Sequence, residues 1–261
     1  MRRLIADPYR MLIAIEYIGN NGPIKKTEFF NYINEFKKMN KNSDKNTKKG
    51  AANDVLFTLQ ELKLIIENNN EIILSSQTDK SFINIYSGKD IFLSLKHKDN
   101  PAAMKMLQTN VFFYSPEVRV VASYIYKKKG VIKSEIGLEF IKKEVYGHKF
   151  NLFTIDTTIA ELERLGIVTK NSEGIYDVTN LHDLIFAQLL VEEITIMSPS
   201  DFIVSERDIK DLFDLKYCLN FSEFDDVFNN IRKSRIPNLI IPGSYGKFSI
   251  NMNVAKEVKL I

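Results

Sequence analysis

The sequence predicts a mainly helical α+β protein that carries small β-hairpins in successive, similar segments. Two stretches lead to this fold class. In "TIAELERLGIVTKNSEGIYDVT", residues 158–179, apolar residues spaced three or four apart give way after Gly166 to two short runs joined by "NSEG". The same change occurs in "LFTLQELKLIIENNNEIIL", where Leu59 and Leu62 precede an Asn-rich turn. A spacing of three or four is typical of a helix face, and alternation is typical of a strand.

Three segments share this order of elements. Residues 9–76 predict two helices around a "GNNGP" turn and a third helix that runs into a hairpin. Residues 116–179 repeat the pattern, with two helices around Gly130. Residues 205–254 follow it loosely: one good helix precedes a helix that leads, past Pro237, into two β-type runs around "PGSYGK". Such internal similarity predicts a tandem architecture.

The predicted organisation has four parts. Residues 1–78 and 115–180 form two domains of three helices and a hairpin, and residues 79–114 form a linker with a helix that starts at Asn100. Residues 181–261 hold an apolar connecting helix and a C-terminal unit of similar order. The connecting helix, "LHDLIFAQLLVEEITIM", has little polar face, so we expect a domain or a partner to cover it.

Composition narrows the class of protein. Of the 261 residues, 44% are hydrophobic and 26% are charged, which is ordinary for a globular protein, and no apolar run is long enough for a membrane span. Asp7 and Pro8 interrupt the first apolar stretch, so we expect no secretory signal, no membrane association and a cytoplasmic location. A net charge of +3 permits nucleic-acid binding without indicating it, so the location of the charge matters more.

Motifs for catalysis are lacking in the sequence. It contains no glycine-rich phosphate loop or dinucleotide fingerprint. His97, His148 and His182 are far apart and lack ligand spacing, and Cys218 lies in "KYCLNF", which is typical of a buried face. We therefore expect a protein that is not an enzyme, with no catalytic residues, no metal site and no cofactor.

A lysine-rich stretch, "KKMNKNSDKNTKKG" at residues 37–50, stands immediately before the third helix of the first segment. Lysines there can contact DNA phosphates, which positions a protein without reading sequence. The alternative is a solvated loop that is basic because it is exposed. The candidate nucleic-acid-binding residues of this stretch are Lys37, Lys38, Lys41, Lys45, Lys48 and Lys49.

In the second segment, the equivalent candidates are Lys142, Lys143, Lys149 and Thr157. We expect neighbouring Asp156 to cap the third helix, because a carboxylate repels phosphate. The last helix of the third segment begins with acidic residues, which would repel a DNA groove, so that segment is expected to be an interaction unit. A competing hypothesis is a phosphate contact there by Arg232, Lys233 and Arg235.

The order of three helices and a hairpin, with its "TIAELERLGIVTKNSEGIYDVT" end, resembles the winged helix-turn-helix superfamily. The resemblance covers residues 9–76 and 116–179 well and residues 205–254 loosely. It implies tandem winged-helix domains, with a third winged-helix-like unit, and a DNA-binding function in which the third helix enters the major groove. Tandem winged helices also resemble the kite subunits of chromosome-organising SMC complexes, which mainly hold a kleisin chain.

Two functions follow from the resemblance. The first is a double-stranded-DNA-binding protein, either a regulator or the DNA-recognition subunit of a mobile-element or defence system. The alternative is a scaffold that holds a protein partner in a larger complex. In both cases, residues 181–261 are expected to serve self-association or partner binding, because residues 201–261 balance nine basic with nine acidic side chains.

Overall fold

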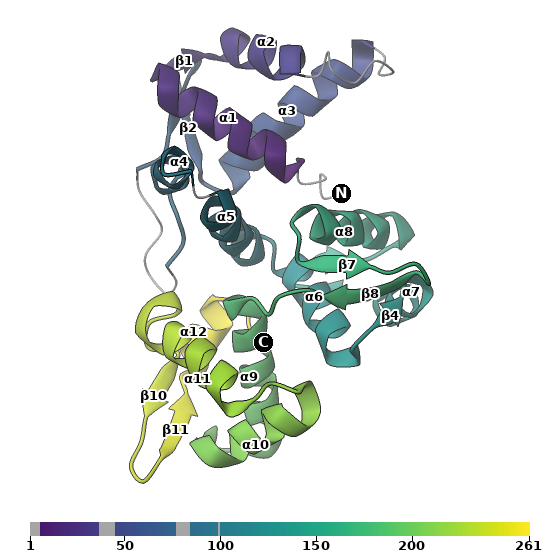
Figure 1. The fold of residues 1–261 in the computed structure, drawn as a ribbon, viewed down its shortest axis with the longest axis vertical. Coiled ribbons are helices and arrows are strands. Elements are labelled where there is room, and N and C mark those ends of the chain that lie inside the picture. Colours follow the sequence, from purple (N-terminus) through teal and green to yellow (C-terminus); the bar gives the residue numbers. More distant parts are fainter. Residues whose placement is uncertain (1–5, 37–44, 77–83, 99) are drawn as a thin grey trace. The chain divides into compact units, whose positions relative to one another are not determined.

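The computed structural model describes residues 6–36, 45–76, 84–98 and 100–261 (Figure 1). Within these ranges, the side chains of residues 36, 45–51, 100 and 148 are not described. The fold is mainly helical with small antiparallel sheets, which confirms the predicted α+β class. The chain divides into two compact units: one within residues 1–78, 85–114 and 156–165, and one within residues 79–84, 115–155 and 166–261. The four-part division stays a prediction.

The first repeat, residues 8–74, has one more strand than the sequence predicted. Its elements are α1 (Pro8–Asn21), β1 (Ile24–Lys25), α2 (Lys26–Phe36), α3 (Lys45–Glu61), β2 (Ile65–Asn68) and β3 (Glu71–Leu74). β1 pairs with β3, so the sheet order is β1-β3-β2. Asn69 and Asn70 have φ values of 51° and 65°, as the two-residue turn of a tight hairpin requires.

The core of the first repeat lies between its three helices and one face of the sheet. The spacing of three and four residues along α1, and the alternation along β3, place the apolar side chains on this side. The buried side chains include Met11, Ile15, Ile18, Phe29, Ile33, Val55, Leu59, Leu62, Ile65, Ile72 and Leu74. Leu59 and Leu62 are therefore core residues, as their spacing predicted.

Two helices between the first and second repeats pack against α1: α4 (Gly88–Lys96) and α5 (Asn100–Tyr114). The predicted start of a helix at Asn100 is confirmed. α4 was not predicted, although Ser87 and Asp90 form a capping box at its start. Gly88 is required there, because a Cβ atom would lie 2.0 Å from the backbone oxygen of Leu64.

The second repeat, residues 116–178, has the same order with an additional small hairpin. Its elements are α6 (Pro116–Lys128), β4 (Val131–Ile132), α7 (Lys133–Phe140), β5 (Glu144–Val145), β6 (His148–Lys149), α8 (Leu152–Arg164), β7 (Val168–Lys170) and β8 (Ile175–Val178). The main sheet has the order β4-β8-β7, and β5 pairs only with β6. Ile159, Leu162 and Leu165 are buried, which confirms the predicted face of α8.

The third repeat, residues 183–250, is more complete than predicted. Its elements are α9 (Asp183–Met197), β9 (Ile203–Ser205), α10 (Glu206–Tyr217), α11 (Phe221–Asn230), the π-helical turn η2 (Ile231–Arg235), β10 (Ile240–Pro242) and β11 (Lys247–Ile250), followed by α12 (Met252–Glu257). The sheet order is β10-β11-β9. In all three repeats, the first strand pairs with the last strand of the hairpin.

The apolar helix α9 stands before β9 and α10, in the place that the first helix takes in the other two repeats. It packs against α6, α11 and η2, and nearly all of its residues from Asp183 to Ile194 are buried. Phe186 lies on Phe213 of α10 and Phe224 of α11, with ring centroids 5.1 and 5.2 Å away. The chain itself thus covers most of the helix, whereas Ile196 and Met197 at its end are exposed.

Candidate interaction surface

The lysine-rich stretch is only partly described. Lys37, Lys38 and Lys41 lie outside the described residues. Lys45, Lys48 and Lys49 belong to α3, which starts at Lys45, whereas the sequence reasoning placed the helix after the lysines. The Lys, Asn, Thr and Ala residues of this stretch permit a helix, and its one glycine does not end it.

The helical positions 45, 48 and 49 precede Ala52, Val55 and Leu56 by seven residues each. Seven residues are about two turns, so these positions continue the buried face of α3 toward its N-terminal end. Ala52, Val55 and Leu56 are buried.

The second group of lysines surrounds the hairpin β5–β6, which the sequence reasoning did not identify. Tyr146 and Gly147 form its turn with φ values of 49° and 82°. The backbone N–H of Lys142 donates to the oxygen of Phe150 at 3.1 Å, and the N–H of Phe150 donates to the oxygen of Lys143 at 2.9 Å. Two residues, Lys142 and Lys143, thus stand opposite the single residue Phe150 and form a β-bulge. Lys142 has a φ of 64°.

These three lysines differ in how they are engaged. Lys142 and Lys149 are exposed and form no ion pair with any described residue, although Lys149 stands opposite Glu144 in the hairpin. Lys143 forms an ion pair with Glu139, one helical turn earlier, and its Nζ lies 5.8 Å from the centre of the Phe140 ring. Of these three lysines, Lys142 and Lys149 can therefore pair with a new partner without breaking an existing ion pair.

The predicted roles at the start of α8 need correction. The Oδ1 of Asn151 accepts a hydrogen bond from the backbone N–H of Thr154 at 2.9 Å, so Asn151 caps this helix and Asp156 does not. The helix begins four residues before Asp156, at Leu152. Thr157 lies in the second turn and is half-buried, whereas Asp156 is exposed.

The third helix of each repeat presents carboxylates to solvent. Glu61 is exposed near the end of α3, Asp156 and Glu163 are exposed on α8, and Glu223 and Asp226 are exposed on α11. Acidic groups repel the phosphates that line a DNA groove. Readout of bases by these helices is therefore disfavoured.

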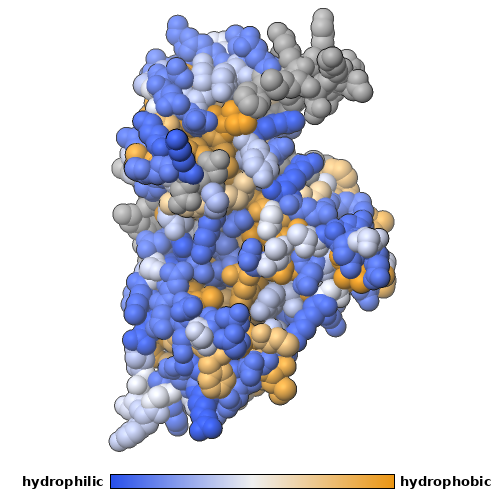
Figure 2. Space-filling model, in the orientation of Figure 1, coloured by the Kyte–Doolittle hydropathy of each residue, from blue (hydrophilic) through white to orange (hydrophobic). Residues whose placement is uncertain are grey.

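Exposed apolar side chains gather around the base of the β5–β6 hairpin. Leu138 in α7 is 80% exposed, and Leu152 and Phe153 in the first turn of α8 are 63% and 56% exposed. Ile141, between α7 and the hairpin, is also exposed. Figure 2 shows orange, hydrophobic surface next to blue, hydrophilic surface in the part of the view where Figure 1 labels α7. We call Leu138, Ile141, Leu152 and Phe153 the hairpin-base patch.

A buried arginine fixes the tip of the same hairpin. The Arg119 guanidinium in α6 is fully buried and is hydrogen-bonded to the Tyr146 hydroxyl in the turn. Its Nε donates to Oε1 of Gln188 at 2.9 Å, and its Nη2 donates to the backbone oxygens of Val258, at 3.3 Å, and Lys259. Burial lowers the pKa of Arg119 to about 10. Sequence reasoning missed this residue, since "PEVRVV" carries no signal that its arginine points inward.

The basic residues of the third repeat do not form a joint phosphate site. Arg232 and Lys233 are exposed, but Arg235 is buried. Its Nε lies 3.2 Å from Oδ2 of Asp183, and its Nη1 donates to the backbone oxygen of Asn84 at 3.0 Å. The hypothesis that all three contact phosphate is therefore wrong for Arg235, because the π-helical turn directs it into the protein.

Cys218 and His182 are both explained by helix ends. Cys218 is exposed at the left-handed C-cap of α10, where its Sγ lies 3.0 Å from Nζ of Lys129, so the predicted burial is wrong. His182 is buried, and its Nδ1 accepts the backbone N–H of Leu184 at 3.2 Å. His182 thus packs in the interior and caps the start of α9.

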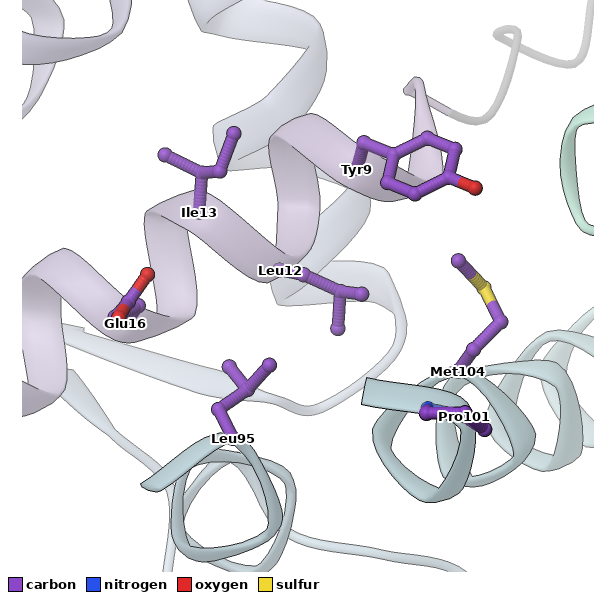
Figure 3. Close-up of a pocket in the computed structure, with 7 residues that line it drawn as sticks. All are labelled: Tyr9, Leu12, Ile13, Glu16, Leu95, Pro101 and Met104. Carbon is purple, nitrogen blue, oxygen red and sulfur yellow. The ribbon is translucent and has the colours of Figure 1, made fainter. Parts of the chain in front are cut away.

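Two apolar grooves lie in the first compact unit. One, of about 470 Å³, is enclosed by α1, α4 and α5 (Figure 3), and its lining residues are Tyr9, Leu12, Ile13, Glu16, Leu95, Pro101 and Met104. Glu16 is its one charged lining residue. The other, of about 500 Å³, lies between the end of α1, the β2–β3 hairpin and α4. Neither lining contains histidine or cysteine.

Comparison with known protein families, curated proteins and solved structures finds no match. In the described part of the chain, no group of three or more His, Cys, Asp or Glu side chains is placed to hold a metal ion. None of the described helices combines the length and the apolar character that crossing a bilayer requires.

Proposed function

We propose that this chain is a tandem winged-helix protein with three such domains, and that it binds duplex DNA through phosphate contacts of its first repeat. The order helix, strand, helix, helix, hairpin recurs three times, with the first strand paired to the last strand each time. This order supports winged-helix domains, because the hairpin that follows a third helix is the wing of that fold. The recurrence also supports the third domain, which the sequence matched only loosely.

The observation that carries DNA binding is the position of the lysines in α3. Lys45, Lys48 and Lys49 stand in its first two turns, directly after a stretch with three further lysines, and its first turn has no acidic residue. The N-terminal end of a helix also bears a partial positive charge. Phosphates are the groups that such a concentration of positive charge attracts most strongly.

The proposed binding does not read the base sequence. The accessible parts of the third helices carry carboxylates such as Glu61, Asp156 and Glu163. Phosphate contacts position a protein on DNA, whereas specificity needs contacts to base edges. We therefore propose a subunit that binds duplex DNA of any sequence through its phosphates. Selection of a particular base sequence would require another protein.

The test is a salt titration of the full chain with a fluorescent duplex of random sequence. The triple variant Lys45→Gln, Lys48→Gln, Lys49→Gln should bind more weakly to every duplex, and the slope of log K against log salt should fall by about 0.9 for each phosphate contact that is lost. The matched control replaces three exposed lysines of the C-terminal part, Lys247, Lys256 and Lys259, with Gln. An equal loss of slope in both variants, or in neither, contradicts the assignment to α3.

The second candidate function, a scaffold that holds a protein partner, is favoured by one specific observation. The third helix of the second repeat begins with exposed Leu152 and Phe153. These apolar side chains make no favourable contact with phosphate. Exposed apolar clusters mark protein-interaction sites in many soluble proteins. The two functions are compatible, since they use different repeats.

A further inference from the structure

We propose that the hairpin-base patch of the second repeat is a docking site for an acidic, amphipathic helix of another protein. The exposure of this patch does not come from loose packing. Ile136, Phe140, Phe150 and Ile155, which lie between or beside the patch residues in the chain, are at most 4% exposed. Leu138, Leu152 and Phe153 therefore face water from a well-packed body.

The backbone brings the patch residues together. The bulge at Lys142 and Lys143 opposite Phe150 closes the hairpin base, so that Ile141 lies one residue before the closed pair and Leu152 two residues after it. Leu138 precedes Ile141 by three residues, at the end of α7, and Phe153 follows Leu152. Two segments that are separated by the hairpin thus contribute to one apolar surface.

This surface is held rigid from behind. The rings of Phe140 and Phe150 lie 5.3 Å apart, and the ring of Tyr124 lies 5.5 Å from that of Phe140. At the far end of the hairpin, Tyr146 is hydrogen-bonded to buried Arg119. A surface that is already ordered loses little conformational entropy when a partner binds, which favours docking.

The rim of the patch selects the charge of the partner. Lys142 is exposed without an ion pair among the described residues, Lys149 stands opposite exposed Glu144, and Glu139 is already engaged by Lys143. The three lysines thus exceed the two glutamates by one positive charge. The first turn of α8 contains no acidic residue, so its positive end adds to the field of the lysines. Carboxylates beside the apolar side chains of a partner would therefore be attracted, and basic groups would be repelled.

Two other occupants fit less well. In a symmetric dimer, the same patch of each copy meets itself, which would bring Lys142 and Lys149 of both copies to one rim. Duplex DNA would pair with the lysines but would leave Leu138, Leu152 and Phe153 in contact with charged phosphates. An amphipathic helix satisfies both parts of the surface, because it carries apolar residues at every third or fourth position and carboxylates beside them.

The experiment is a selection from a displayed library of random peptides of about 16 residues, which is enough for roughly four helical turns. The target is the full chain, and the counter-target is its variant Leu138→Gln, Leu152→Gln. We expect enriched sequences with Leu, Ile or Phe at helical spacing and an excess of Asp and Glu. Affinities of the enriched peptides are then measured by fluorescence anisotropy, and self-association is measured by sedimentation.

The variant Leu138→Gln, Leu152→Gln should lose binding about tenfold or more, because a few residues dominate most interfaces. A control with equally exposed side chains, Leu215→Gln, Ile196→Gln, should bind as the unchanged chain does. Lys142→Glu should weaken acidic peptides and leave neutral ones nearly unaffected. The proposal would be overturned if no peptide is enriched, if the enriched peptides are basic, or if the control loses binding as much as the patch variant does. It would also be overturned if the patch variant abolishes only self-association or only DNA binding. The salt slope of the α3 lysine variant is independent of all these outcomes.

Discussion

The Nε of Arg235, in the π-helical turn after α11, lies 3.2 Å from Oδ2 of Asp183, in the first turn of α9, and both side chains are buried. Asn230 donates a second hydrogen bond to the same carboxylate oxygen at 2.6 Å. The pair joins the first helix of the third repeat to the end of its third helix. Four predictions follow from this and related contacts.

Asp183→Asn should destabilise the protein by about 3–5 kcal/mol, because it removes the buried carboxylate that pairs with the guanidinium of Arg235. The free energy of unfolding can be measured by urea denaturation. The double variant Asp183→Leu, Arg235→Met should cost less than the single change, since it removes both charges together. If the single change costs no more than the double one, the two charges are not coupled as described.

Leu162→Ala should lower the free energy of unfolding by roughly 2–5 kcal/mol, because the side chain is fully buried in α8 and its loss leaves a cavity. Leu138→Ala, at an exposed position of α7, is the matched control and should change stability by less than about 0.5 kcal/mol. Equal melting temperatures for the two variants would show that α8 is turned differently from the structure.

Stability should fall at high pH through Tyr217. Burial, together with the hydrogen bond that its hydroxyl donates to Glu193, raises the pKa of this phenol above its ordinary value of 10.0. Below pH 10 the folded and unfolded states are both protonated, so the contribution of Tyr217 is fully present. Above about pH 10 the unfolded state loses the proton first, and stability declines.

The variant Tyr217→Phe should show a shallower loss of denaturation midpoint between about pH 9 and pH 11 than the unchanged chain does. The comparison cancels the effects of lysines and of Arg119, which both chains contain. Tyr245→Phe is the control, because Tyr245 is fully exposed. Parallel pH curves for Tyr217→Phe and the unchanged chain would contradict the assigned role.

Tyr146→Phe should loosen the β5–β6 hairpin, since Arg119 loses a hydrogen-bond acceptor at its tip. Leaving a buried donor without its partner costs about 1–3 kcal/mol, so amide exchange within residues 143–150 should become about tenfold faster or more. Amides in the middle of α9 serve as the internal reference. Equal acceleration in both places would mean that the whole unit is destabilised and not the hairpin alone.

The sequence was sufficient for the elements with a clear period. Leu59, Leu62, Ile159, Leu162 and Leu165 fall on core faces as their spacing predicted. The first strand of each repeat was missed because β1 and β4 have two residues each and β9 has three, too few to show alternation. These strands are recognised only through their pairing with the last strand of each hairpin.

Other errors have a common cause, which is that sequence spacing does not show what surrounds a residue. α9 has little polar face, so no face could be assigned to it, and its place in the third repeat depends on its contacts with β9, α11 and η2. Cys218 lies between apolar neighbours but is exposed, because the helix ends there in a left-handed residue. The hairpin-base patch was missed for the same reason, since nothing in the spacing of Leu152 and Phe153 shows that they are exposed.

The hydrogen bonds of Arg119 also set an order of events during synthesis. Its acceptors on Val258 and Lys259 lie 139 and 140 residues further along the chain. A ribosome that adds about 5–20 residues per second needs on the order of ten seconds to produce them. During that interval α6 has been made, but the guanidinium of Arg119 still lacks two of its hydrogen-bond acceptors. Its burial would therefore cost free energy. The second compact unit therefore completes its fold only after Val258 and Lys259 have been made.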